Sequence, residues 1–151
     1  MQAEVACCPE TGDAAWTIRL ALQGDALAVR RGLGLLFTDP RLAALSPDSR
    51  GTAEIVLAEV LNNIVEHAYA LVPGGVEVTI RLLERGLCCC IRDHGAPMPG
   101  LELPPGQPVD CSDELPEGGF GWFMIRSLAR NLRYCRGGRW NELCFLLPVN
   151  E

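Results

Sequence analysis

Apolar residues recur at alternate positions in four short stretches of the chain, and this period of two is typical of β-strands. The stretches cover residues 16–22, 76–82, 87–93 and 140–147, and residues 133–136 predict a fifth, shorter strand. A Glu-Arg-Gly turn separates the second stretch from the third, and a Gly-Gly turn precedes the last one. The sequence therefore predicts a hairpin at each of these two turns.

Three longer stretches predict helices, at residues 25–38, about 47–70 and about 120–132. Ser46 and Pro47 predict an N-cap followed by a proline at the first helical position, and Pro73-Gly74-Gly75 ends that helix. The order β-α-α-β-β-loop-α-β-β indicates the α+β class. We expect a two-layer α/β sandwich, with helices on one face of a mixed, mostly antiparallel sheet.

The chain has the length of a single domain. Residues 1–15 precede the first strand and are expected to form an N-terminal arm, while residues 16–151 form the domain. Residues 94–119 contain six prolines and five glycines and predict a long irregular loop. Loops of that length inside compact domains are usually functional.

The composition excludes several mechanisms, because all 13 basic residues are arginine. A chain without lysine has no Walker A lysine, no strand lysine of a eukaryotic-type protein kinase and no Schiff-base lysine. A net charge of -6 argues against nucleic acid and anionic membranes as partners. No apolar run approaches the ~18 residues of a membrane span, and the first residues lack the pattern of a secretory leader, so we expect a cytoplasmic protein.

Eight cysteines raise the question of disulfides or a metal site. We expect reduced thiols without export, and the chain has no CxxC pair. Cys88, Cys89 and Cys90 are consecutive on a predicted strand, so their side chains alternate between its two faces and cannot all ligate one tetrahedral ion. We therefore expect most of the cysteines to act as small buried hydrophobes.

Glu59, Asn63 and His67 lie four residues apart and form one polar stripe on the longest predicted helix. Such a stripe is often only the solvated face of an amphipathic helix. However, asparagine is a poor helix former, and here two asparagines sit in mid-helix. A carboxylate and an amide oxygen one turn apart could hold Mg²⁺ and its waters or act as a general base.

Two further segments could carry chemistry. Asp93, Gly95 and Pro97 follow a predicted strand, where an ordinary turn is the plain alternative. Gly118-Gly119 and Gly121 precede the last predicted helix, where glycines and free N–H groups favour phosphate binding. Each segment alone is weak evidence of a site.

Together the three segments read E-x-x-x-N-x-x-x-H-A-Y, D-x-G-x-P and G-G-x-G-x-x-x-I, in that order. This order and spacing resemble the GHKL (Bergerat-fold, histidine-kinase-like) ATPases over about residues 16–148. Within that superfamily, the first motif and the small size look most like the bacterial anti-sigma-factor serine kinases.

The resemblance implies ATP and Mg²⁺ as cofactors, with a cofactor-binding set of Asn63, Asp93, Gly95, Pro97, Gly118, Gly119, Gly121 and Arg126. In such a site Asn63 would coordinate Mg²⁺, and Glu59 would be the catalytic general base. Asp93 would accept a hydrogen bond from the adenine amino group, and Gly95 would give the base room. The glycines would surround the phosphates, and residues 98–116 would form the ATP lid. His67 would be peripheral.

The chain departs from the family pattern in two places. Where many members have a Gly-Thr pair whose threonine supports the adenine-binding aspartate, this chain has Gly138-Arg139-Trp140-Asn141, so Asn141 or a water would substitute. The lid contains no arginine or lysine and carries four acids, Glu102, Asp110, Asp113 and Glu114. It should close poorly over a triphosphate unless Mg²⁺, Arg126 or a partner offsets the repulsion.

Three functions follow from the resemblance. The first is an anti-sigma factor and protein serine kinase that phosphorylates an anti-anti-sigma (STAS-type) partner and controls a sigma factor. The alternative is a nucleotide-binding or degenerate partner-switch module without kinase activity. An ATPase domain that feeds phosphate to a histidine on a separate protein ranks third. A homodimer is possible, since the first strand could be an exposed edge.

Overall fold

Five strands form a single sheet in the computed structural model, which describes residues 8, 10, 12–105 and 120–149. The strands are β1 Trp16–Gln23, β2 Gly75–Leu83, β3 Gly86–Asp93, β4 Arg130–Gly137 and β5 Trp140–Leu147. Their order across the sheet is β1-β2-β3-β5-β4, and each neighbouring pair is antiparallel. The third strand, β3, is therefore central, and it is paired with β2 on one side and β5 on the other as far as its last residue.

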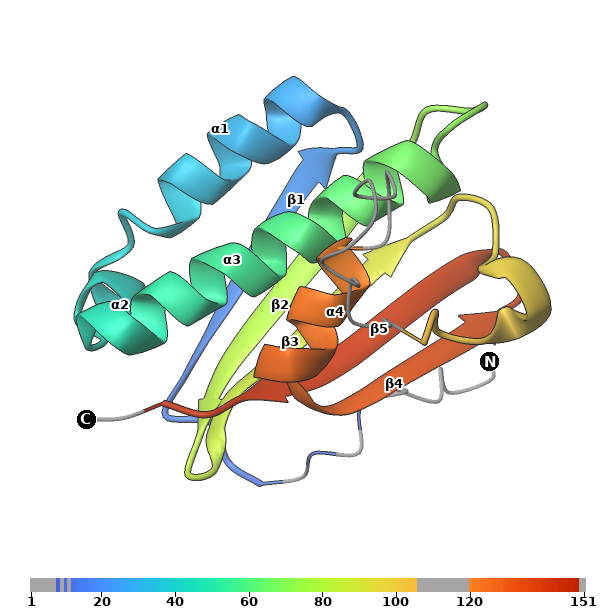
Figure 1. The fold of residues 1–151 in the computed structure, drawn as a ribbon. Coiled ribbons are helices and arrows are strands. Elements are labelled where there is room, and N and C mark those ends of the chain that lie inside the picture. Colours follow the sequence, from blue (N-terminus) through green and yellow to red (C-terminus); the bar gives the residue numbers. More distant parts are fainter. Residues whose placement is uncertain (1–7, 9, 11, 106–119, 150–151) are drawn as a thin grey trace, which may run out of the picture.

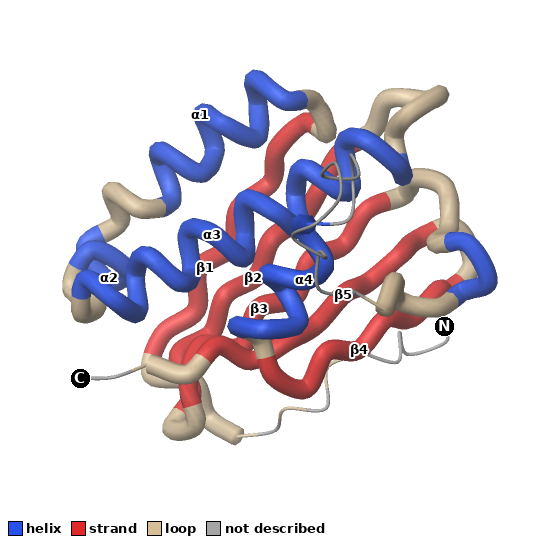
Figure 2. Tube along the Cα trace, in the orientation of Figure 1, coloured by secondary structure: helices blue, strands red, loops and turns tan. Residues whose placement is uncertain are grey.

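Helices cover one face of this sheet (Figure 1). The helical elements of the described chain are α1 Ala26–Leu36, α2 Pro40–Ala43, α3 Pro47–Asn63, a π-helical turn η1 Ile64–Ala68, a 3-10 turn η2 Pro99–Leu101 and α4 Phe120–Leu128. Figure 2 shows α1, α3 and α4 side by side on that face. The predicted two-layer α+β arrangement is confirmed.

The main helix begins where the sequence predicted it. Ser46 caps α3, since its Oγ accepts a hydrogen bond from the Ser49 N–H at 3.2 Å, and Pro47 follows at the first helical position. The regular α-helix ends earlier than predicted, at Asn63. The chain then widens into the π-turn, in which the Tyr69 N–H bonds to the Ile64 carbonyl at 3.0 Å. Such π-turns often occur at functional sites.

The core lies between α3 and the sheet. Alternate residues of β2, β3 and β5 point toward the helices, as the period of two requires. Apolar side chains of α3 fill the space above them. The buried set includes Val56, Leu57, Val60, Leu61, Val76, Val78, Ile80, Cys89, Ile91, Leu143 and Phe145.

Two element boundaries differ from the predictions. The last helix ends at Leu128 instead of about residue 132, and β4 begins at Arg130 instead of residue 133. Asn131 adopts a φ of 54°, which no right-handed helix accommodates, and the ladder from β4 to β5 shifts register at this point. The apolar spacing of Leu128 and Leu132 imitated a helix across this break.

The short helix α2 was not predicted. Its start has a local cause, because the Asp39 carboxylate accepts a hydrogen bond from the Arg41 N–H at 2.9 Å and Pro40 occupies the first helical position. Four residues are too few for an apolar period to be recognised. No helix in the described part of the chain has the length and apolar character needed to cross a membrane.

The packing of α3 gives a stability prediction. Leu57 is 0% exposed, so Leu57→Ala should lower the free energy of unfolding by about 2–5 kcal/mol through lost burial and a residual cavity. Ile55 lies on the same helix and is 43% exposed, so Ile55→Ala is the matched control and should cost less than about 1 kcal/mol. Urea denaturation of both variants measures the difference, and equal losses would contradict the packing described for α3.

Candidate functional site

A pocket opens where α3 and η1, the end of β3, the start of α4 and strand β5 meet. Apolar side chains form most of its wall, including Val60, Ile64, Ile91 and Leu143. The polar groups that line it are Asn63, His67, Asp93, Tyr134 and Asn141. A mostly apolar cleft with a few convergent polar groups is the usual form of a small-molecule site.

Asp93 is the buried acid of this pocket, with 4% of its surface exposed. Its Oδ1 accepts two hydrogen bonds of 2.8 Å, one from the Asn141 Nδ2 and one from the Gly95 N–H. Burial raises the pKa of the Asp93 carboxyl above its ordinary value, although these hydrogen bonds oppose the shift. Both bonds end on Oδ1, which leaves Oδ2 without a donor among the residues that the structure describes.

Asn141 is held in place by a network of its own. Its Oδ1 accepts hydrogen bonds from the Tyr134 hydroxyl at 2.5 Å and from the Arg136 guanidinium at 3.0 Å. Its Nδ2 also donates to the Ala96 carbonyl at 3.0 Å. Asn141 therefore does what the resemblance expects of the missing threonine, because it donates a hydrogen bond to the aspartate from the last strand.

The π-turn and the residue after it, Tyr69, hold the segment after β3. The Tyr69 hydroxyl accepts a hydrogen bond from the His94 N–H at 2.8 Å and donates one to the Gly75 carbonyl at 2.6 Å. The Ala96 N–H donates to the Ala68 carbonyl at 2.9 Å. A Cβ on Gly95 would lie only 2.3 Å from the Ala68 oxygen, so this close approach requires glycine. That Gly95 also makes room for an adenine stays a prediction.

The stripe on α3 faces α4 near the pocket. The Nδ2 of Asn63 is buried and has no hydrogen-bond partner in the described part of the chain. Glu59 is half-buried one turn earlier. A Cβ on Gly121 would lie 2.6 Å from the Glu59 Oε2 and 3.5 Å from the Asn63 Nδ2, so the first turn of α4 lies directly against both groups. The stripe is thus more than a solvated helix face.

The other predicted residues have different positions. Pro97 lines the pocket, and His67 lies at its rim with a side chain that is 67% exposed. Arg126 donates from Nε to the Pro104 carbonyl at 2.7 Å, so it binds the described part of the lid. Gly118 and Gly119 lie outside the described residues, as do lid residues 106–116. The roles expected of Gly118, Gly119 and three of the four lid acids therefore stay predictions.

Sequence reasoning missed three residues of the site. Trp122 is buried and lines the pocket. Tyr134 and Arg136 reach Asn141 from β4, and they are two residues apart on a strand that was predicted. Their shared face was a usable signal, because alternate strand residues point the same way. What they contact depended on the register of β4 against β5, which the sequence pattern left open.

The chain matches the model of a known protein family. The model of the family described as "Histidine kinase-like ATPase domain" matches residues 21–146. No curated protein matches the chain. The matched segment contains every described residue of the pocket.

The buried carboxylate leads to a prediction about pH. Because the folded pKa of Asp93 is raised, its ionisation reduces stability as the pH rises through that pKa, and Asp93→Asn removes this loss. The variant keeps an oxygen for Asn141 and should be more stable than the natural chain at pH 7. The advantage should shrink in urea denaturation as the pH approaches 4.

Asp39→Asn is the control of opposite sign. The hydrogen bonds from Arg41 lower the pKa of the Asp39 carboxyl to about 2, so its ionisation stabilises the fold at neutral pH. This stabilisation is lost as the pH falls toward 2, and the variant should lack it. A loss of stability at pH 7 in Asp93→Asn would show that the hydrogen bonds to the carboxylate outweigh its burial.

Proposed function

The chain belongs to the histidine kinase-like ATPase domain family, and from this premise we propose that its pocket binds Mg·ATP and that the chain phosphorylates a serine of a STAS-type anti-anti-sigma partner. Membership of this family makes ATP the expected ligand. The observation that carries the proposal is the buried carboxylate of Asp93, which is held at Oδ1 and keeps Oδ2 for a ligand.

Adenine fits this arrangement chemically. The ring is flat and largely apolar, as are the pocket walls at Ile64, Ile91 and Leu143. Its exocyclic amino group can donate to the Asp93 Oδ2, in a hydrogen bond that the acceptor's charge strengthens. Guanine has a carbonyl at the corresponding ring position, and two acceptors cannot pair. The site should therefore prefer adenine.

The groups around Asn63 fit a magnesium ion and phosphates. A buried amide without a partner costs free energy, and a bound ligand would relieve that cost. Rotation of the Asn63 amide by 180° exchanges its oxygen and nitrogen, so the oxygen can serve as a metal ligand. When bound, Mg²⁺ neutralises phosphate charge. The N-terminal end of α4 at Gly121 favours anions as well.

Glu59 is placed for proton transfer. Its carboxylate lies one helical turn from Asn63 and against the start of α4, so a serine hydroxyl presented there could lose its proton to Glu59. The support for serine as acceptor is the resemblance of the E-x-x-x-N-x-x-x-H-A-Y segment to the anti-sigma-factor kinases. A sigma factor would be the second partner. The edge position of β1 supports a homodimer through strand pairing.

One observation favours a binding module without chemistry. Arg126 is the arginine that was expected to offset the acidic lid, and it donates to the Pro104 and Leu103 carbonyls at 2.7 Å and 3.5 Å. A guanidinium engaged with the lid backbone contributes less to phosphate charge. In this second candidate, nucleotide binding changes the surface that a partner recognises, and no phosphoryl group is transferred.

Asp93→Asn tests the binding step. The amide cannot accept the adenine hydrogen bond while holding Asn141, so ATP affinity should fall by roughly 10-fold or more, the worth of one hydrogen bond to a charged group. Isothermal titration with Mg·ATP and Mg·GTP measures this, and the natural chain should prefer ATP. Asp48→Asn, an exposed position on α3, is the control and should bind as the natural chain does. Unchanged affinity in Asp93→Asn would contradict the adenine assignment.

Glu59→Gln separates the two candidate functions. It should abolish phosphate transfer from labelled ATP to a STAS-type protein while ATP affinity stays within about 3-fold, because the amide keeps the shape but accepts no proton. Glu54→Gln is exposed on the same helix and should transfer normally. Transfer by Glu59→Gln at the natural rate would contradict its role as base. A natural chain that binds ATP and partner without transfer would establish the binding module.

A further inference from the structure

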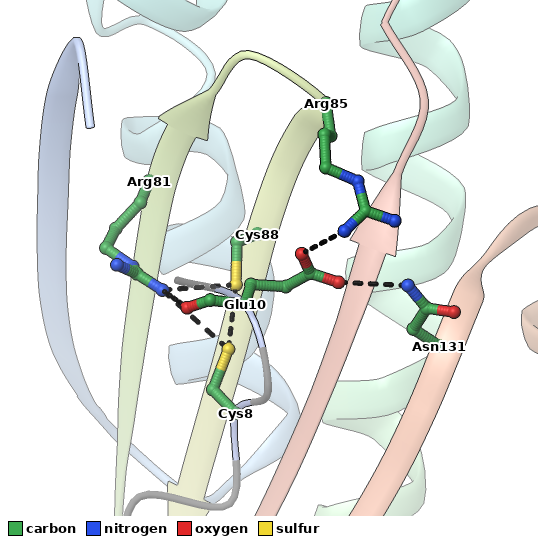
Figure 3. A network of polar contacts seen from close by, with 6 residues as sticks. All are labelled: Cys8, Glu10, Arg81, Arg85, Cys88 and Asn131. Carbon is green, nitrogen blue, oxygen red and sulfur yellow. Dashed lines mark hydrogen bonds and ion pairs between the residues drawn. The ribbon is translucent and has the colours of Figure 1, made fainter. Parts of the chain in front are cut away.

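Four cysteine side chains gather on the sheet face that the helices leave uncovered. Cys88 and Cys90 occupy alternate positions of β3, so they share this face, while Cys89 points into the core. Cys144 on β5 is the direct cross-strand partner of Cys90, with 2.7 Å between the sulfurs. Cys8 comes from the segment before β1, and its sulfur lies 3.0 Å from that of Cys88 (Figure 3).

The spacing of these sulfurs suits a tetrahedral thiolate site. The sulfurs of Cys8, Cys88 and Cys90 all lie within 4.8 Å of one another. Thiolates that share one zinc ion at about 2.3 Å each are roughly 3.8 Å apart. Shifts of about 1 Å by side chains with a single rotatable torsion bring the three into that arrangement. Cys144 touches Cys90 and forms a second group with Cys90 and Glu142, so Cys144 is a candidate for a fourth ligand that reaches the ion beside Cys90.

The position of Arg81 independently indicates that the thiol cluster can accommodate negative charge. Its guanidinium lies 3.7 Å from the Cys8 sulfur and 3.6 Å from the Cys88 sulfur. No carboxylate in the described part of the chain forms an ion pair with Arg81, whereas neighbouring Arg85 pairs with Glu10. A cation whose neighbours are thiols favours their ionised form and can donate to metal-bound sulfur.

We propose that Cys8, Cys88, Cys90 and Cys144 bind one Zn²⁺ ion on this face of the sheet. Binding forms four Zn–S bonds and releases four thiol protons, and the adjacent Arg81 offsets part of the remaining negative charge. The site is separate from the pocket, which lies on the other side of the sheet, and it does not depend on the proposed kinase activity.

A metal accounts for the cluster better than disulfides do. The closest sulfurs form two pairs, Cys8 with Cys88 at 3.0 Å and Cys90 with Cys144 at 2.7 Å, and two disulfides would account for these pairs alone. The sulfur of Cys90 also lies within 4.8 Å of those of Cys8 and Cys88, and a shared metal ion accounts for this link between the pairs. A bound cation displaces the thiol protons itself when it binds the sulfurs.

The ion would fasten the segment before β1 to the sheet. Glu10 already attaches that segment to the sheet, and this residue is only 7% exposed. Its carboxylate accepts hydrogen bonds from Arg85 at 3.3 Å and from Asn131 at 2.9 Å. Its main-chain oxygen accepts from Arg81 at 3.2 Å (Figure 3). Zinc ligation by Cys8 would add a second anchor two residues away, where Cys8 packs against the small buried cluster of Leu83, Cys88 and Leu146.

Metal analysis of the full chain tests the proposal. The protein, expressed with added zinc and purified under a non-thiol reductant, should contain about one zinc per chain. Cys8→Ser should reduce that content to below about a fifth, and Cys89→Ala, which alters the core-facing cysteine, should leave it unchanged. Co²⁺ added to the metal-free chain should give the thiolate charge-transfer band and the visible bands of a tetrahedral site, and Cys8→Ser should lack that spectrum.

Two results would overturn the proposal. One is a natural chain without zinc that also shows no thiolate band when Co²⁺ is titrated. The other is peptide mapping of the reductant-free chain that finds Cys8 bonded to Cys88, or Cys90 to Cys144, since the cluster would then be a pair of disulfides. Cys8 lies outside the sheet, and circular dichroism of Cys8→Ser checks that the fold is retained. The cobalt titration of the natural chain decides the matter even if that variant fails to fold.

Discussion

The buried hydrogen bond from Asn141 to Asp93 is the constraint on which the site depends. A carboxylate with 4% exposure needs donors, and the antiparallel register of β3 and β5 places Asn141 directly opposite Asp93. The side-chain oxygen of Asn141 in turn accepts hydrogen bonds from Tyr134 and Arg136, and these two residues bring the edge strand β4 into the site. One buried charge thus ties the last three strands and the segment after β3 into a single polar network.

The other half of the site depends on how α3 ends. If the regular helix continued to residue 70, as its sequence suggested, the last turns would keep the α-helical phase. The π-turn at Ile64–Ala68 changes that phase, and the Ala68 carbonyl and the Tyr69 hydroxyl both bind the segment after β3. The helix that carries Glu59 and Asn63 is therefore joined to the segment after Asp93 by one backbone contact and one tyrosine side chain, and Gly95 is the residue that permits the close approach.

The sequence predicted the local pieces well because their causes are local. Leu143, Phe145 and Leu147 recur at alternate positions and residues 140–147 form β5 with the predicted limits, and Ser46-Pro47 starts α3. Errors occurred where tertiary structure decides. Leu132 continues a helical spacing, yet the left-handed Asn131 and pairing with β5 place it on a strand. The family motifs predicted Asn63 and Asp93 as neighbours of one pocket, but their order alone did not reveal the partners Tyr134 and Arg136.

The cysteine cluster was also only partly predictable from the sequence. Alternation along β3 correctly excluded a site made from three consecutive cysteines, because Cys89 faces the core. The alternation also put Cys88 and Cys90 on the same face of β3. The other two cysteines of the cluster, Cys8 and Cys144, are far away in the sequence, and no spacing pattern connects them to this strand. The strand that carries the buried acid on its helix-facing side thus carries two thiols on its other side. Since a shift of one residue in the pairing of β3 would reverse both faces, the register that buries Asp93 is also the register that gathers the thiols.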